Sequence, residues 1–454
     1  MSGPHVIDPS SLEFAVPFGY LVAVALTATP TLCALAPLRR PPVLDTVSFR
    51  LGVALNELPF IPLYFLLGST LLAFGQGDVN SPGGWATFGL AVLTTLGLAV
   101  VARRGLRARP AIDAALAEAF GAKWRTNLDS NLAAGPRRQL PWARILFRPV
   151  FAGRREVEHV ANIRYGNAGK RNLLDVYHHR SRPGGGPILI HLHGGGYVSG
   201  RKNSQSLPLL HRLASQGWVC ISANYRLRPA VGFPEHLIDA KKVIAWARQH
   251  AHEYGADPAA LFMAGSSAGA HLTALAALTT NNPRFQPGFE QADTSVTAAV
   301  CLNGYYGPYY NHSDTQEPPS SPHAYIRPEA PPFFLAHGDH DTVVPVETAR
   351  QFAERLRRSS SNPVVYVELP SAQHAFDLFH SVRFEAVIDA IEQFAVSVTA
   401  QASGRGGHRA ASAQAGTSAT PTHSLHGGTD RQDPAGDVAM APILHAKPRV
   451  GGPL

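Results

Sequence analysis

Residues 263–270 read Met-Ala-Gly-Ser-Ser-Ala-Gly-Ala and contain a Gly-x-Ser-x-Gly pattern with Ser267 at its centre. The apolar run Ala259–Ala264 before it predicts a strand, and the run Ala270–Leu278 after it is compatible with a helix. A strand, a sharp turn and a helix make up a nucleophile elbow, whose glycines allow a cramped turn that exposes the serine hydroxyl. Such a pattern also arises by chance in a chain rich in Gly and Ala, so the rest of the sequence must show whether Ser267 is catalytic.

A glycine-rich stretch, His-Gly-Gly-Gly at residues 193–196, precedes the serine pattern in the chain. It follows the apolar run Pro187–Leu192, which predicts a buried strand. Acyl transfer builds negative charge on the former carbonyl oxygen, and backbone N–H groups reach that charge only where no side chain blocks them. A plain turn after a strand is the alternative. Beside a serine elbow we expect an oxyanion hole, completed by the amide of Ala268.

A base and an acid should follow the serine, in the order Ser, Asp, His for this type of site. The strand candidate Pro332–Ala336 leads into a loop that contains Asp339 and Asp341. The strand candidate Val364–Leu369 leads into a loop that contains His374. A serine hydroxyl needs a base to take its proton, and the imidazole needs a carboxylate to fix its tautomer. We assign these roles to His374 and Asp341, with Asp339 as the rival acid.

Residues 156–398 resemble the hormone-sensitive-lipase-like branch of the α/β-hydrolase superfamily. The segments that carry the resemblance are His193-Gly194-Gly195-Gly196, Asn224-Tyr225-Arg226-Leu227 with Phe233-Pro234 and Asp239, Gly265-Ser266-Ser267-Ala268-Gly269, the Asp341 loop, and Gln373-His374-Ala375-Phe376. Together with its apolar N-terminal region, the chain is similar to actinobacterial membrane-associated carboxylesterases of the Lip series. The resemblance implies an α/β-hydrolase fold with a mostly parallel sheet, and the hydrolysis of carboxylic esters.

The same resemblance implies how the oxyanion is held. Gly195, Gly196 and Ala268 would donate the hydrogen bonds, and neither a cofactor nor a metal is required. Two positions depart from the usual motif, because Ser266 stands where the family often has Asp, and Ala270 where it often has Gly. Neither departure removes a reacting group, but the acyl preference stays open.

The 454 residues divide by composition into five parts. These are a tail (1–13), a membrane region (14–103), a basic juxtamembrane or cap segment (104–155), the catalytic domain (156–398) and a C-terminal tail (399–454). Charged residues make up 16% of the chain, against about 25% in typical soluble domains. The C-terminal tail has no Phe, Trp or Tyr after residue 400, so we expect it to be disordered.

Three apolar segments near the N-terminus predict membrane helices, because each approaches the roughly 20 residues that cross a hydrocarbon core. They are Phe14–Pro37, Leu51–Phe74 and Trp85–Ala102. One or two of them could instead be buried or interfacial. Lys and Arg gather in residues 38–50 and 103–109 but are absent from 75–84, which predicts a multi-pass protein of the cell membrane with its catalytic domain in the cytoplasm.

The segment 103–155 carries 12 Lys and Arg against three acidic residues. Such a segment beside a membrane helix is attracted to anionic lipid headgroups. We therefore expect membrane lipids as partners, and no nucleic acid, since no nucleic-acid motif accompanies the basic charge. The helical spacing of Ala111–Lys123 fits either a cap over the active site or a simple linker helix.

The catalytic part alternates strands with helices, which predicts a parallel sheet covered on both faces. The long loop Gly304–Pro331 is rich in tyrosine, and loops of this length often act as lids or binding loops. If Tyr306 and its neighbours narrow the pocket, the preferred substrates have short to medium acyl chains. A membrane location favours long lipid chains instead.

Cysteine and histidine give no metal site. We expect Cys33, Cys220 and Cys301 to be reduced, because their number is odd and their spacing fits no metal. His191 and His193 could form a metal pair, but the His-Gly-Gly-Gly motif uses His193 to brace its loop.

The sequence therefore predicts a membrane-anchored serine carboxylesterase. Alternatives are a lipase, an amide or formamide hydrolase on a lipid-like substrate, or an inactive hydrolase-fold scaffold.

Overall fold

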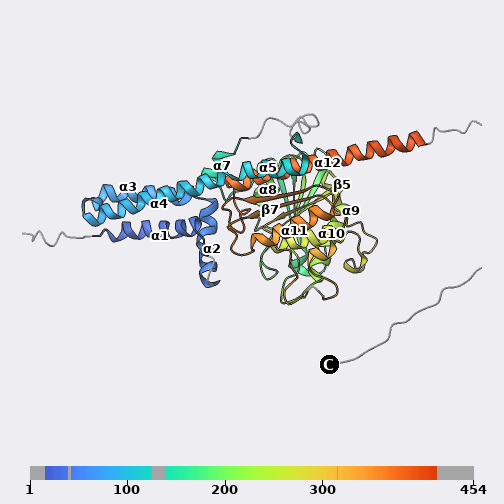
Figure 1. Ribbon diagram of the computed structural model, residues 1–454, viewed down its shortest axis with the longest axis horizontal. Coiled ribbons are helices and arrows are strands. Elements are labelled where there is room, and N and C mark those ends of the chain that lie inside the picture. Colours follow the sequence, from blue (N-terminus) through green and yellow to red (C-terminus); the bar gives the residue numbers. More distant parts are fainter. Residues whose placement is uncertain (1–15, 39–41, 125–138, 314, 417–454) are drawn as a thin grey trace, which may run out of the picture. The chain divides into compact units, whose positions relative to one another are not determined.

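A computed structural model of the chain describes residues 16–38, 42–124, 139–313 and 315–416. Its centre is one eight-stranded sheet in the order β1-β2-β4-β3-β5-β6-β7-β8 (Figure 1). The strands are β1 (Val157–Arg164), β2 (Leu173–His179), β3 (Gly186–Leu192), β4 (Val219–Ala223), β5 (Ala256–Ser266), β6 (Ala298–Leu302), β7 (Phe333–Gly338) and β8 (Val364–Leu369). Strands β3 to β8 are parallel, whereas β1 and β2 pair in antiparallel fashion. The mostly parallel sheet is the one that the alternating pattern predicts.

Helices cover both faces of the sheet. One face carries α9 (Glu235–His250), α10 (Ala268–Leu278) and α11 (Val346–Ser359), and the other carries α5 (Ala108–Phe120), α8 (Leu207–Ala214) and α12 (Val382–Gly416) (Figure 1). Successive strand residues point to opposite faces, so in β3 Ile188 and Ile190 enter the first core while Leu189 enters the second. Both faces need apolar residues, which is why the strands read as continuous apolar runs.

Helix α5 belongs to the second of these layers and does not line the active-site cavity. Its Ile112 and Leu116 are buried in the core with α8 and α12, and Arg109 pairs with Asp389 at 3.0 Å. A cap over the active site is therefore the wrong interpretation of 111–123. The helix is a structural link, because its apolar stripe faces the sheet.

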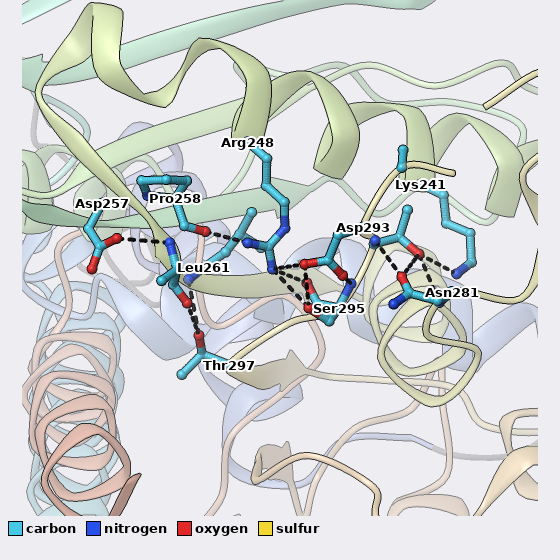
Figure 2. A network of polar contacts seen from close by, with 12 residues as sticks. Lys241, Arg248, Asp257, Pro258, Leu261, Asn281, Asp293, Ser295 and Thr297 are labelled. Atoms are coloured by element: carbon cyan, nitrogen blue, oxygen red, sulfur yellow. Dashed lines mark hydrogen bonds and ion pairs between the residues drawn. The ribbon is translucent and has the colours of Figure 1, made fainter. Parts of the chain in front are cut away.

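A polar network fixes the segment between α10 and β6 (Figure 2). Arg248 of α9 donates to the Ser295 carbonyl at 2.8 Å and lies 3.4 Å from Asp293. The Thr297 hydroxyl accepts from the Leu261 amide at 3.0 Å. These contacts align the start of β6 with β5, the strand that ends at the serine elbow.

Four apolar helices precede the sheet: α1 (Phe18–Leu35), α2 (Pro42–Glu57), α3 (Phe60–Gln76) and α4 (Pro82–Leu106). By length and composition, α1 and the continuous helical stretch Pro82–Phe120 could each cross a membrane. Residues Thr46–Glu57 and Phe60–Gln76 meet at 88° and could together supply a third crossing. The apolar segment Leu51–Phe74 is thus not one continuous helix, since the chain bends at Leu58-Pro59.

The contacts among these helices suit an apolar environment. The hydroxyls of Thr27, Thr87 and Thr94 each donate to the carbonyl four residues earlier, which satisfies them within their own helix. A Cβ at Gly97 would come within 2.9 Å of Thr31, so α1 and α4 approach closely there. Small residues at close helix contacts are typical of membrane bundles.

Helix α12 continues to Gly416. Residues 399–416, the first part of the predicted disordered tail, are thus helical, since this run is rich in alanine and contains no proline. The rest of the predicted tail lies outside the described residues, as do the predicted tail at 1–13 and residues 125–138 of the basic segment.

Candidate active site

Ser267 occupies a strained turn between β5 and α10, with φ 54° and ψ −117°. Its amide donates to the Leu302 carbonyl at 2.8 Å, which holds the turn against β6. The turn needs a glycine at 269, because a Cβ there would lie 2.0 Å from the Leu192 carbonyl oxygen. Gly265 packs equally closely, since its Cβ would lie 2.2 Å from the Gly269 oxygen. The conformation projects the serine hydroxyl from the carboxyl edge of the sheet.

The structure brings Ser267, His374 and Asp341 together in the predicted order. His374 Nε2 lies 3.0 Å from Ser267 Oγ, and His374 Nδ1 lies 2.7 Å from Asp341 Oδ2. His374 and Asp341 are each only 6% exposed. With a proton on Nδ1, the imidazole presents its free Nε2 to the serine hydroxyl, which is the arrangement that base catalysis requires.

Further contacts hold the Asp341 carboxylate. Its Oδ1 accepts from the amides of Val343 and Val344, both at 2.8 Å. Its Oδ2 lies 3.2 Å from His337 Nε2. Burial alone would raise the pKa of Asp341, but the charge of His374 and hydrogen bonds from His337 and His374 outweigh it and lower that pKa. Asp341 therefore stays ionised beside the imidazole.

The contact between His374 and Asp341 also sets the basicity of His374. Burial acts to lower its pKa, but the charge and hydrogen bond of Asp341, with a contribution from Asp377, raise it above 6.5. Gln373 Oε1 accepts from the amides of both Thr342 and His374, at 2.8 and 2.9 Å. One side chain thus joins the acid loop to the base loop.

Asp339, the rival acid, lies elsewhere. Its Oδ1 accepts from the Ser371 amide at 2.5 Å, and the carboxylate that contacts His374 is that of Asp341. The structure places Asp339 as a support for the loop that carries His374. His337, two residues earlier, was missed in the sequence because a histidine at a strand end looks like any core residue.

The glycine loop lies beside the serine. Gly195 and Gly196 have φ of 109° and 57°, and both line the same cavity as Ser267 and Ala268. A left-handed backbone at both positions turns the loop toward the elbow, and L-residues with side chains rarely adopt it.

Contacts on both sides fix the glycine loop. Gln205 accepts from the Gly194 amide, and the Tyr225 hydroxyl donates to the His193 carbonyl at 2.8 Å. The His193 ring stacks on Tyr225 at 4.5 Å between centroids and, through Nδ1, contacts the Gly194 oxygen at 2.6 Å. Burial lowers the pKa of His193 to about 4. A neutral, stacked ring braces this loop.

The other histidine of the pair contacts a different group, since His191 Nε2 lies 3.1 Å from Ser266 Oγ. Among the described residues no cluster of three His, Cys, Asp or Glu could hold a metal ion. All three cysteines are free thiols.

A buried carboxylate behind the elbow escaped the sequence analysis. Asp377 is fully buried and accepts from the hydroxyls of Ser266 and Ser206, at 2.5 and 2.6 Å. Asn303 donates to its other oxygen at 3.4 Å. Three residues after His374, Asp377 puts a carboxylate beside Ser266, the position where related motifs often carry Asp.

A cavity of about 740 Å³ opens in front of Ser267. Tyr305, Tyr309 and Tyr310 of the long loop line it. Tyr306 does not, because it is 1% exposed and stacks on Phe352 at 4.2 Å. The expectation that Tyr306 narrows the pocket is therefore wrong. A run of tyrosines without a regular period does not reveal which ring faces inward.

One wall of the cavity comes from the N-terminal region. Phe49 of α2 lines it, with its ring 6.2 Å from that of His374 in an edge-on arrangement. No sequence signal connects the two residues, which lie more than 300 positions apart.

Comparisons with known proteins place the chain in a family. The BD-FAE family profile matches residues 174–310 and 305–356. The probable carboxylic ester hydrolase LipM of Mycobacterium tuberculosis is 37% identical over 412 residues, which cover 84% of this chain and 94% of LipM. This chain belongs to the Lip-type carboxylic ester hydrolases of the α/β-hydrolase superfamily. It is a hydrolase enzyme, and its substrates are small-molecule esters.

Other Lip-type relatives resemble the chain over much of its length. Esterase LipQ of the same organism is 36% identical over 72% of this chain and 86% of its own. Among solved structures, the butyrate-bound esterase Est2 of Thermogutta terrifontis is 25% identical, with a TM-score of 0.47, over 54% of this chain and 95% of its own.

Proposed function

We propose that this Lip-type hydrolase cleaves carboxylic esters with Ser267 as nucleophile, His374 as general base and Asp341 as the acid that orients it. His374 Nε2 takes the hydroxyl proton while Ser267 Oγ bonds to the ester carbonyl carbon. The bond between the carbonyl carbon and the alkoxide oxygen then breaks, the protonated imidazole gives its proton to that oxygen, and the alcohol leaves while the acyl group stays on Ser267 as an ester. A water molecule repeats both steps, releases the carboxylic acid and restores Ser267.

The amides of Gly195, Gly196 and Ala268 would hold the negative oxygen formed in each half. Fixed backbone donors need no reorganisation when the charge develops, and loss of one such donor typically costs about 10²–10³ in rate. The position of all three residues beside Ser267 in one cavity supports this role.

One observation carries the proposal, namely the continuous chain of contacts from Ser267 Oγ through His374 to Asp341 in a buried site. A fluorophosphonate probe, which reacts only with an activated serine, tests it. We expect one covalent adduct at Ser267, located by peptide mass spectrometry, and none in Ser267→Ala. An unmodified wild-type Ser267 would favour an inactive scaffold.

We further propose short- to medium-chain esters as substrates, because rings of the tyrosine loop line the cavity. The apolar N-terminal helices favour a second candidate, a lipase acting on long lipid chains. Rates with p-nitrophenyl esters of two to sixteen carbons separate the two. A kcat/KM that rises steadily to the longest chains would support the lipase.

Membrane anchoring by α1, α3 and α4, with the catalytic domain in the cytoplasm, completes the proposal. Support comes from the exposed apolar residues around α7 (Trp142–Phe147), among them Phe147 (72% exposed) and Phe151 (59%). Arg144 and Arg148 are close to them in the chain, and basic side chains beside exposed apolar ones suit an anionic lipid surface. In intact cells an engineered cysteine at Asp78 should react with an impermeant maleimide, and one at Arg107 should not. Reaction at 107 would invert the topology.

A further inference from the structure

Helix α2 is attached to the segment that carries His374. The Asn56 amide donates to the Ser371 carbonyl at 3.0 Å, three residues before His374. Glu57 accepts from the Ser381 hydroxyl at 2.6 Å and forms an ion pair with Arg383. The end of α2 therefore holds both flanks of the His374 loop.

The attachment is buried, which makes it a defined geometry and not a loose surface contact. The side chains of Glu57 and Arg383 are each 1% exposed. A buried charge is tolerated only when a partner and hydrogen bonds compensate it. Separation of the two side chains would therefore leave each charge without its partner. Arg383 also donates to the Pro370 carbonyl at 3.3 Å.

This attachment determines where Phe49 lies. Phe49 sits eight residues before Glu57 on the same helix, and its ring contacts that of His374 in an edge-on arrangement at the cavity wall. It is half-buried, whereas Val47 and Leu51 on either side are 45% and 41% exposed. One side of α2 thus forms a cavity wall, and the other exposes apolar side chains.

The tyrosine loop and the residues after the acid form the rest of the mouth. Tyr310 and Val343 both line the cavity and are 49% and 50% exposed. An ester chain that leaves Ser267 toward this mouth meets apolar atoms on each side. Burial of its methylenes against these residues is favourable, in proportion to the area covered.

We propose that Phe49 is a specificity-determining residue, and that α2 makes the membrane region a wall of the ester pocket that sets the chain length accepted. The substrate class is esters with an apolar chain long enough to reach this wall. The inference rests on the proposed esterase function, because it concerns the same cavity.

Two opposite changes of the wall test it in the full-length protein in detergent micelles. Phe49→Ala opens the wall by a whole phenyl ring, and we expect the ratio of kcat/KM for p-nitrophenyl octanoate over acetate to rise by about tenfold or more, because even one methylene in a pocket typically changes this discrimination about tenfold. Phe49→Trp fills the wall and should lower the same ratio. Val47→Ala, a matched loss from the exposed side of α2, should leave it unchanged.

Fluorophosphonate labelling of each variant separates the two proposals. Equal labelling of Ser267 in all variants, with ratios that stay within twofold of wild type, would overturn the role of Phe49 alone. Absence of labelling in the wild type would overturn the esterase mechanism itself. Equal labelling, with an octanoate-to-acetate ratio that rises in Phe49→Ala and falls in Phe49→Trp, supports the role of Phe49 as a wall of the pocket.

Discussion

The inner side of the ester cavity, around Ser267, and its outer side, around Phe49, are assembled over very different distances in the chain. The inner side comes from two short motifs at the ends of β3 and β5, which are adjacent in the sheet. The outer side joins α2 to a segment more than 300 residues later. The proposed reacting groups thus lie at strand ends within one sheet, whereas the proposed substrate-selecting wall depends on packing between distant helices and loops.

The largest effect tests the inner side. Ser267→Ala should lower kcat/KM for p-nitrophenyl butyrate by on the order of 10⁴-fold or more, because it removes the hydroxyl that is aligned with His374 Nε2. Ser266→Ala is the matched control, since its hydroxyl points to Asp377. An unchanged thermal midpoint shows that the fold persists. A larger loss of kcat/KM in Ser266→Ala than in Ser267→Ala would show that Ser267 is not the nucleophile.

The two aspartates of the acid loop offer the next contrast. Asp341→Asn should lower kcat by roughly 10³–10⁴-fold, because an amide fixes the wrong imidazole tautomer. Asp339→Asn should cost less than about tenfold, since it removes only a support of the Ser371 backbone. Steady-state kinetics of both variants measures the two losses of kcat. A larger loss in Asp339→Asn than in Asp341→Asn would make Asp339 the acid that orients His374.

The pH dependence follows from the charges around His374. Its pKa is raised, mainly because Asp341 outweighs burial. A protonated imidazole cannot accept the serine proton, so kcat/KM should fall as pH drops through this pKa. Asp377→Asn removes a second negative charge and should move the acid limb to lower pH. A limb that stays in place, or moves upward, would exclude an electrostatic role for Asp377.

The smallest effect on activity is expected in the tyrosine loop, where Tyr306 and Tyr310 should differ in what their removal changes. Tyr306→Ala should lower the free energy of unfolding by about 3–5 kcal/mol, as for other buried rings, and leave the chain-length preference unchanged. Tyr310→Ala should change that preference a few-fold with little loss of stability, because its ring lies at the cavity mouth. Chemical denaturation and the ester series measure both. A change in chain-length preference on Tyr306→Ala would show that Tyr306 does line the pocket.

These contrasts explain how much the sequence could reveal. The Gly-x-Ser-x-Gly pattern singled out Ser267, and the loops that follow predicted strands, taken in the order Ser, Asp, His, singled out Asp341 and His374, because parallel strands end at one edge of the sheet. Periodicity does not report contacts across 300 residues, so Phe49 went unnoticed. Pro59 and the polar pair Asn56-Glu57 weaken the apolar run as a single helix, but the sequence does not give the 88° angle between the two helices.

Asp377 escaped for a different reason. The usual motif places a carboxylate directly before the nucleophile, and here Ser266 occupies that place while the carboxylate arrives from a separate loop. A motif read along the chain misses a group that the fold supplies from elsewhere.

The ion pair between Glu57 and Arg383 also has a consequence for biosynthesis. The two residues are 326 positions apart, and at about 5–20 residues per second the ribosome needs roughly 16–65 s to travel between them. Throughout that interval Glu57 has no Arg383 to neutralise it, so α2 cannot settle against the catalytic domain. A chain interrupted before Arg383 cannot form this buried pair, so its membrane region and its catalytic part stay unjoined at this point, and incompletely folded chains are degraded in cells.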